Sequence, residues 1–195
     1  YALKIDDTIL TWGGWEKSLE IRIQGVRIQN RAGTTVATVP EATIDLSGRA
    51  LFRGMIAPTR LELIGANARL LRLVDGRVIF GISGDDAEAP SENTGKLFQS
   101  LIEELTGPPD MERPMGYLRQ ITITDADLAI YDQPSGTIWR GPRTQLTLTR
   151  DQNGIRGELG TGILVQDRTW QIDVSGNYEP DRHVIHLTIQ FGEFE

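Results

Sequence analysis

A stretch of the chain from Leu19 to Leu46 recurs later in the sequence with almost the same pattern. A shift of 102 positions, without a gap, places its apolar residues on those of a second stretch, Ile121 to Leu148. Each copy contains an alternating apolar segment, a turn with glycine, and a second alternating segment interrupted by Pro40 or Pro142. Because a repeat at a fixed spacing indicates a duplicated unit, the sequence predicts a fold built from duplicated β-hairpins.

The alternation changes parity at one position within each copy. Apolar residues before Gly25 have odd numbers, and those after it have even numbers; the same change occurs near Asp6, Gly65 and Asp125. Since strand side chains have a period of two, a regular strand would turn its apolar side to the other face at these points. We expect a β-bulge at each, which keeps one face on the core and bends the sheet. Strands that simply end there are the alternative.

The predicted fold class is mainly β, with long, bent antiparallel strands in a curved meander and one short amphipathic helix. A first β unit occupies residues 1–83, a linker occupies 84–116, and a second β unit occupies 117–195. The helix is expected at about 94–106, where apolar residues recur at helical spacing. We expect the two units to share one continuous sheet, and the chain to be a fragment of a longer protein.

Composition excludes several classes of function. The formal charge of −7 and the pI near 4.9 argue against a nucleic-acid partner, which requires a concentrated basic patch. The absence of cysteine excludes disulfides and thiolate metal sites. No apolar run is long enough to predict a membrane-spanning helix.

Nothing in the sequence supports an enzyme, a metal site or a cofactor. Asp125 and Asp127 could form a carboxylate pair, but no nucleophile or histidine lies near them, and Asp is common at bends. His183 and His186 are three apart on a predicted strand, so they would face opposite sides. No catalytic or phosphate-binding motif occurs.

The shape of the predicted sheet is the remaining indication of function. A sheet bent repeatedly in one direction either closes around a packed core or stays open as an apolar trough. An open trough would bind lipid acyl chains, with each buried methylene contributing about 0.8 kcal/mol. Burial in a closed core would count against this hypothesis. The candidate lining residues are Ile21, Ile23, Ile28, Leu61, Leu63, Ile121, Ile123, Leu128, Ile130, Leu146 and Leu148.

The stretch from Leu3 to Ile82 resembles the N-terminal periplasmic region of AsmA-like bacterial envelope proteins, the superfamily that includes YhdP and TamB. The features that carry the resemblance are Gly25-Val26, Gly33, Pro40, Leu46-Ser47, Gly54, Pro58, Leu61, Gly65 and Asp75-Gly76, in the expected order. The resemblance implies a taco-like β-groove in the periplasm, anchored to the inner membrane by an upstream helix. It also implies a role in phospholipid movement to the outer membrane and in envelope integrity.

Three hypotheses therefore remain. The favoured one is a non-enzymatic periplasmic groove segment that shelters phospholipid acyl chains. The second is a structural module with a packed core, whose exposed strand edges pair with other envelope proteins. The third is a carbohydrate-binding β-domain, in which tryptophans would stack on sugars, although tryptophans more often fill cores. The tryptophans are Trp12, Trp15, Trp139 and Trp170.

Overall fold

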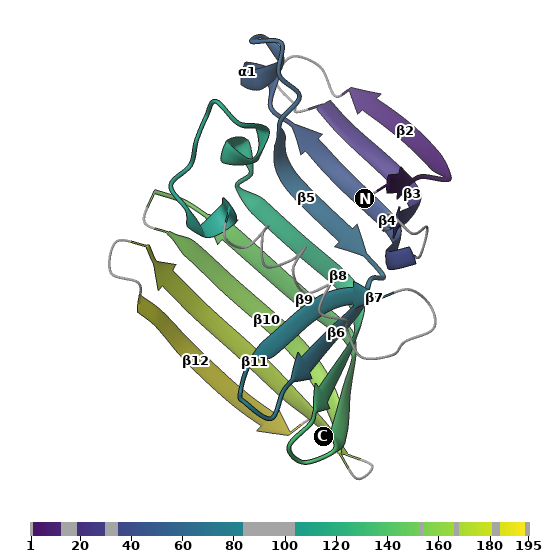
Figure 1. The fold of residues 1–195 in the computed structure, drawn as a ribbon, viewed down its shortest axis with the longest axis vertical. Coiled ribbons are helices and arrows are strands. Elements are labelled where there is room, and N and C mark those ends of the chain that lie inside the picture. Colours follow the sequence, from purple (N-terminus) through teal and green to yellow (C-terminus); the bar gives the residue numbers. More distant parts are fainter. Residues whose placement is uncertain are drawn as a thin grey trace.

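The computed structural model is a mainly β protein built on one mixed, 12-stranded sheet that does not close on itself (Figure 1). The mainly β prediction is thus confirmed. The described residues are 2–12, 19–29, 35–83, 104–152, 154–165, 168–180 and 184–193.

The sheet contains strands from both predicted units. The strands are β1 (Ala2–Lys4), β2 (Asp7–Trp12), β3 (Leu19–Gln29), β4 (Thr35–Leu46), β5 (Pro58–Ile64), β6 (Asn67–Arg72), β7 (Val78–Ser83), β8 (Gln120–Asp132), β9 (Thr137–Arg150), β10 (Ile155–Val165), β11 (Arg168–Glu179) and β12 (Val184–Glu193). Their order is β1-β3-β4-β5-β8-β9-β10-β11-β12, while β2 also pairs with β3, and β6 pairs with β7 and β8.

Strand register confirms the predicted duplication. In the first copy, Ile21 lies opposite Ile44 across the β3–β4 pair. In the second copy, the residues 102 positions later, Ile123 and Leu146, lie opposite each other across the β8–β9 pair. The two hairpins therefore have the same pairing as well as the same sequence pattern.

A bend crosses the sheet at the positions where the parity changes. β1 and β2 are two limbs of one bent strand, joined at Asp6, and both pair with β3. β5 and β6 are likewise two limbs of a strand that pairs with β8. Gly25, Gly65 and Asp125 have φ angles of 62°, 71° and 52°, in the left-handed region. The four predicted bends are therefore present.

The predicted bulges are present only in part. β8 has one residue more than β9 between Ile123 and Ala126, and a compensating shift follows beside Arg143, which has a φ of 57°. No register shift occurs at Gly25, because it lies level with Pro40 and both strands change parity there. In β3 and β4 the face is therefore kept by a left-handed glycine opposite a proline, not by an added residue.

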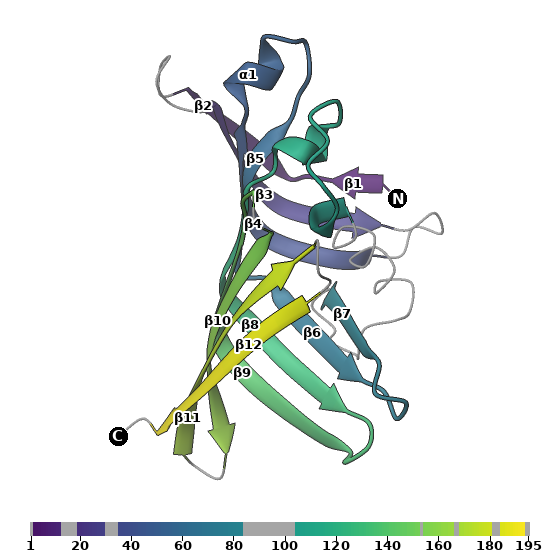
Figure 2. The same cartoon turned by 90° about the vertical axis from the view of Figure 1, so that its left-hand side faces the viewer.

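The bend folds the apolar face of the sheet onto itself. One cluster contains residues from both sides of the bend. Ile23, Ala42 and Ile123 lie on one side of it, and Val26 and Leu128 lie on the other. Figure 2 shows the sheet edge-on, with β1, β6 and β7 projecting to the same side. The parity change is what allows both limbs to contribute apolar residues to this cluster, which we call the bend core.

One other expectation needs correction. The sheet is not an antiparallel meander throughout, because β5 and β6 pair with β8 in parallel. A parallel contact arises because the two duplicated units lie side by side in the same orientation. Most of the helix expected at about 94–106 lies outside the described residues. Its described end, residues 104–106, is helical. The described part contains a short helix α1 (Gly48–Leu51) and a 3-10 helix η1 (Pro114–Tyr117).

The Gly25→Ala variant should lower the free energy of unfolding by about 1–3 kcal/mol. Its φ is unfavourable for alanine, and the Asp6 carboxylate occupies the position of the new Cβ. Urea denaturation measures the change. Gly48→Ala is the matched control, because nothing lies within 4 Å of its Cβ position, and we expect it to change stability by less than about 0.5 kcal/mol. Equal losses in the two variants would contradict this account of the bend.

Candidate functional site

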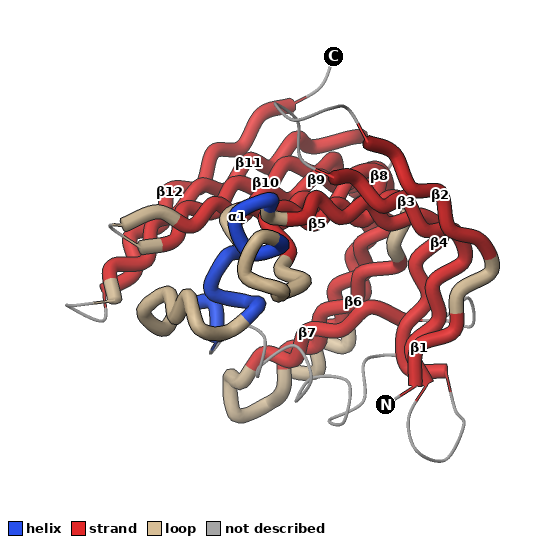
Figure 3. Tube along the Cα trace, turned by 90° about the horizontal axis from the view of Figure 1, so that it is seen from above, coloured by secondary structure: helices blue, strands red, loops and turns tan. Residues whose placement is uncertain are grey.

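The candidate site is the concave face of the sheet. Seen from above, the strands from β12 to β2 form an arch (Figure 3). Residues directly opposite each other in neighbouring antiparallel strands share a face, so the register assigns side chains to this side. Across β9, β10, β11 and β12 the rows are Arg150–Ile155–Tyr178–Ile185, Leu148–Gly157–Gly176–Leu187 and Leu146–Leu159–Val174–Ile189.

All the predicted lining residues lie on this apolar face, in two clusters. Those in or against the bend core are Ile21, Ile23, Ile28, Leu63, Ile123, Leu128, Ile130 and Leu146. Those in a second cluster, beside Leu105 and Leu118, are Leu61, Ile121 and Leu148. Ile23, Ile121, Ile123 and Leu128 are buried, and the other members are partly buried. The predicted lining is therefore mainly the packed floor of the arch.

The exposed part of the concave face lies on β12. Ile185, Leu187, Ile189 and Phe191 are 63%, 65%, 52% and 69% exposed. They continue a face whose residues on β10 and β11 are partly buried, among them Val174. The predicted lining did not include these residues of β12. Alternation gives the direction of a side chain and carries no information on what covers it.

Two glycines make the middle row of this face shallow. Gly157 and Gly176 are opposite each other on β10 and β11. A Cβ atom at Gly157 would lie 3.2 Å from Cδ2 of Leu148, and one at Gly176 would lie 2.6 Å from Cδ2 of Leu187. The leucine side chains on either side thus lean over the glycines, so the row is smoothly apolar and has no projecting side chain at its centre.

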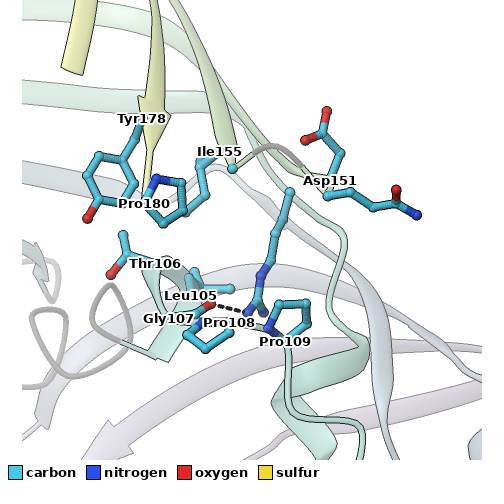
Figure 4. Close-up of a pocket in the computed structure, with 12 residues that line it drawn as sticks. Leu105, Thr106, Gly107, Pro108, Pro109, Asp151, Ile155, Tyr178 and Pro180 are labelled. Carbon is cyan, nitrogen blue, oxygen red and sulfur yellow. Dashed lines mark hydrogen bonds between the residues drawn. The ribbon is translucent and has the colours of Figure 1, made fainter. Parts of the chain in front are cut away.

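A pocket of about 470 Å³ lies where the concave face meets the segment that follows the helical residues 104–106 (Figure 4). We call it the arginine pocket, because Arg150 lies within its wall. Its volume falls in the range of small-molecule sites, roughly 300–1,000 Å³. The lining residues are Leu105, Thr106, Gly107, Pro108, Pro109, Arg150, Asp151, Gln152, Gly154, Ile155, Tyr178 and Pro180.

Arg150 is the unusual residue of this pocket. It is 7% exposed, and its Nη2 donates a 2.6 Å hydrogen bond to the carbonyl oxygen of Gly107, which is the dashed line in Figure 4. Its Nη1 is buried and has no hydrogen-bond partner among the described residues. Leaving such a donor unpaired costs roughly 1–3 kcal/mol. Arg150 therefore lines the pocket and has one unused donor.

The electrostatic environment of Arg150 is also unfavourable. Burial lowers the pKa of its guanidinium below the ordinary value, and the charge of Arg119 lowers it further, while Glu104 opposes this effect. Arg119 is the residue next to Arg150 across the β8–β9 pair, since the backbone N–H of Arg150 donates to the Arg119 carbonyl oxygen at 2.8 Å. Two cations thus lie together at the end of an apolar face.

Arg150 was not predicted as a site residue, although a signal for it exists. Leu146, Leu148 and Arg150 are alternate residues of one strand, so the pattern places a charge at an inward position. Charged residues are rarely buried without a partner. An inward arginine that breaks an apolar alternation is therefore a candidate functional residue.

The other residues considered from the sequence occupy the following positions. Asp125 is exposed at the bend, and the Asp127 carboxylate pairs with the buried guanidinium of Arg69 at 3.1 Å, which joins β8 to β6. Trp139 and Trp170 are partly exposed on β9 and β11, which are not neighbouring strands. His183 and Trp15 lie outside the described residues. No group of three or more potential metal ligands occurs in the described part of the chain.

The comparisons with known proteins give no relative. No family model, no curated protein and no solved structure matches the chain. Among the residues that the structure describes, no helix is both long and apolar enough to cross a membrane.

Replacing Arg150 with methionine should leave the thermal unfolding midpoint unchanged or raise it. The change removes an unpaired buried donor and a repulsive charge pair, and it keeps most of the side-chain volume, although the bond to Gly107 is lost. Arg150→Ala should instead lose about 1–3 kcal/mol, because it also removes packing. Thermal denaturation followed by circular dichroism measures both. A loss of more than about 1 kcal/mol in Arg150→Met would show that the guanidinium stabilises the fold.

Proposed function

We propose that the chain is a non-enzymatic segment of a periplasmic envelope protein and that its concave β-face shelters the acyl chains of phospholipids. The observation that carries this proposal is the row of exposed apolar side chains on the concave face of β12. It continues, without an intervening charged side chain, the partly buried face of β10 and β11. Exposed apolar surface of this extent typically marks an interaction site.

An acyl chain suits this surface because the face provides apolar contact area and few hydrogen-bonding groups. The exposed apolar residues of β12 on this face are Ile185, Leu187, Ile189 and Phe191, which have no hydrogen-bonding side-chain groups. The strands from β5 to β12 make the face roughly 24 Å wide at about 4.8 Å per strand. Burial of about six methylenes would contribute roughly 5 kcal/mol before the cost of ordering the chain.

The proposed location follows from the resemblance to AsmA-like proteins. That resemblance implies an anchor upstream of this segment, the periplasmic face of the inner membrane, and a part in phospholipid transport to the outer membrane. An arched β-sheet that does not close on itself is the architecture such a groove needs. The segment would then form one part of a longer conduit.

Native mass spectrometry of the protein, expressed in a bacterium and purified without detergent, tests this function. We expect phospholipid to co-purify with the wild-type chain and to fall at least about tenfold in Ile189→Asp, because a carboxylate on the exposed apolar face opposes acyl-chain binding. Ile189 is chosen because, unlike Ile123, it lies outside the packed core.

Thr188→Asp is the matched control for this experiment. It introduces the same charge at an exposed position one residue away on β12, on the opposite face of the strand. Lipid retained in Thr188→Asp and lost in Ile189→Asp would support the groove. A wild-type chain without lipid, or equal losses in the two variants, would contradict it.

The edge of β12 supports a second candidate, in which this strand pairs with another protein. Within the described part of the chain β12 pairs only with β11, so its outer edge has unpaired backbone groups next to exposed apolar side chains. Such edges favour strand addition. In the same spectra, a dimer or a protein complex that carries no lipid would favour this candidate over the groove.

A further inference from the structure

The arginine pocket is at one end of the proposed acyl-chain surface. Arg150, Ile155, Tyr178 and Ile185 form a single cross-strand row, and the next row along the strands contains Leu148 and Leu187. The polar end of the face is therefore continuous with the apolar part. A molecule lying along the concave face would meet the arginines at one end and aliphatic side chains along the rest of its length.

The pocket has a donor that the protein does not use. Nη2 of Arg150 is bound by the Gly107 carbonyl oxygen at 2.6 Å, whereas Nη1 is buried and has no partner among the described residues. Arginine at 7% exposure is more than nine-tenths buried, so water does not readily replace a missing partner. An acceptor that enters the pocket would complete the hydrogen bonding of this guanidinium, and a charged acceptor would do so most strongly.

The charges around the pocket favour an anion. Arg119, the residue immediately before β8, lies beside Arg150. The Glu104 carboxylate, which is the nearby opposing charge, already pairs with Arg113 at 3.7 Å. Figure 4 shows the carboxylate of Asp151 directed away from Gly107 and Pro109. An anionic group bound beside the Arg150 guanidinium would offset the repulsion that Arg119 exerts on it.

The apolar residues in the wall of the pocket favour an anion that carries an apolar chain. Apart from Arg150, the lining includes Leu105, Pro108, Ile155 and Pro180, which offer apolar contact. Inorganic phosphate would leave these walls unused. A chain that leaves the pocket past Ile155 and Tyr178 would continue directly onto the exposed face of β12.

We propose that the arginine pocket binds the phosphate or carboxylate group of an anionic amphiphile, with Arg150 and Arg119 as its partners, while the acyl chain extends along the concave face toward Ile189. This assignment rests on the proposed function and narrows its substrate class to lipids with an accessible anionic group. Specificity for the charged group then comes from the end of the face, and tolerance for different chains comes from its middle.

Isothermal titration calorimetry of the whole chain tests the proposal with three probes: dodecyl phosphate, dodecyl maltoside and inorganic phosphate, the amphiphiles being kept below the concentration at which they form micelles. We expect dodecyl phosphate to bind at least about tenfold more tightly than either of the others. Arg150→Met should reduce this preference over dodecyl maltoside to less than about threefold. The Arg156→Met control removes the same charge from an exposed position on the same sheet, so it should keep the preference.

The outcomes separate the pocket from the groove. Equal affinity of the wild-type chain for the two amphiphiles, or an unchanged preference in Arg150→Met, would overturn the anion site while leaving the groove intact. If inorganic phosphate binds as tightly as dodecyl phosphate, the proposal that the ligand is an amphiphile is contradicted and a free-phosphate site is indicated. Failure of both amphiphiles to bind would contradict the groove and this proposal together. Weaker binding of both amphiphiles to Ile189→Asp, with the preference for dodecyl phosphate over dodecyl maltoside kept, would support the arrangement of chain and head group.

Discussion

The period of two along a β-strand is the constraint on which this structure depends. A long strand that bends must keep its apolar side chains on one face, and the chain does this by changing parity at a single level across several strands. At Gly25 and Gly65 the change uses left-handed glycines, and at Asp125 it accompanies an added residue in β8. The Asp6 carboxylate, ion-paired with Arg27, fills the space above Gly25. Backbone geometry at a few residues therefore decides which surfaces of the whole sheet can meet.

The same apolar face has two outcomes in one molecule. Where the sheet bends, the face folds onto itself, and residues such as Ile123 become a dry core. Toward β12 no second limb returns within the described residues, so residues with the same alternation, such as Ile189, stay exposed. The bend core supplies stability, while the far end of the face stays exposed. One strand pattern therefore gives both a packed core and an exposed apolar surface.

The arginine pocket shows a tension between stability and use. A buried guanidinium beside a second cation, with one donor unpaired, is unfavourable for the fold considered alone. Local violations of the rules of packing and pairing occur preferentially at functional positions. In the proposed function, the position of Arg150 at the junction of the apolar face and the Leu105–Pro109 segment gives the violation a use, because it adds a polar end to a surface that otherwise offers only apolar contact.

The sequence by itself determined the strands, the duplication and the level of the bends, because periodicity, glycine and turn residues are local properties of the chain. It also placed the candidate lining on one face. Only the tertiary structure decided that β5 and β8 pair in parallel and that Ile123 is buried while Ile189 is exposed. These two isoleucines occupy equivalent positions in alternating strands, so no local pattern distinguishes them. Burial depends on which distant limb lies opposite, and that contact is made only when the sheet bends.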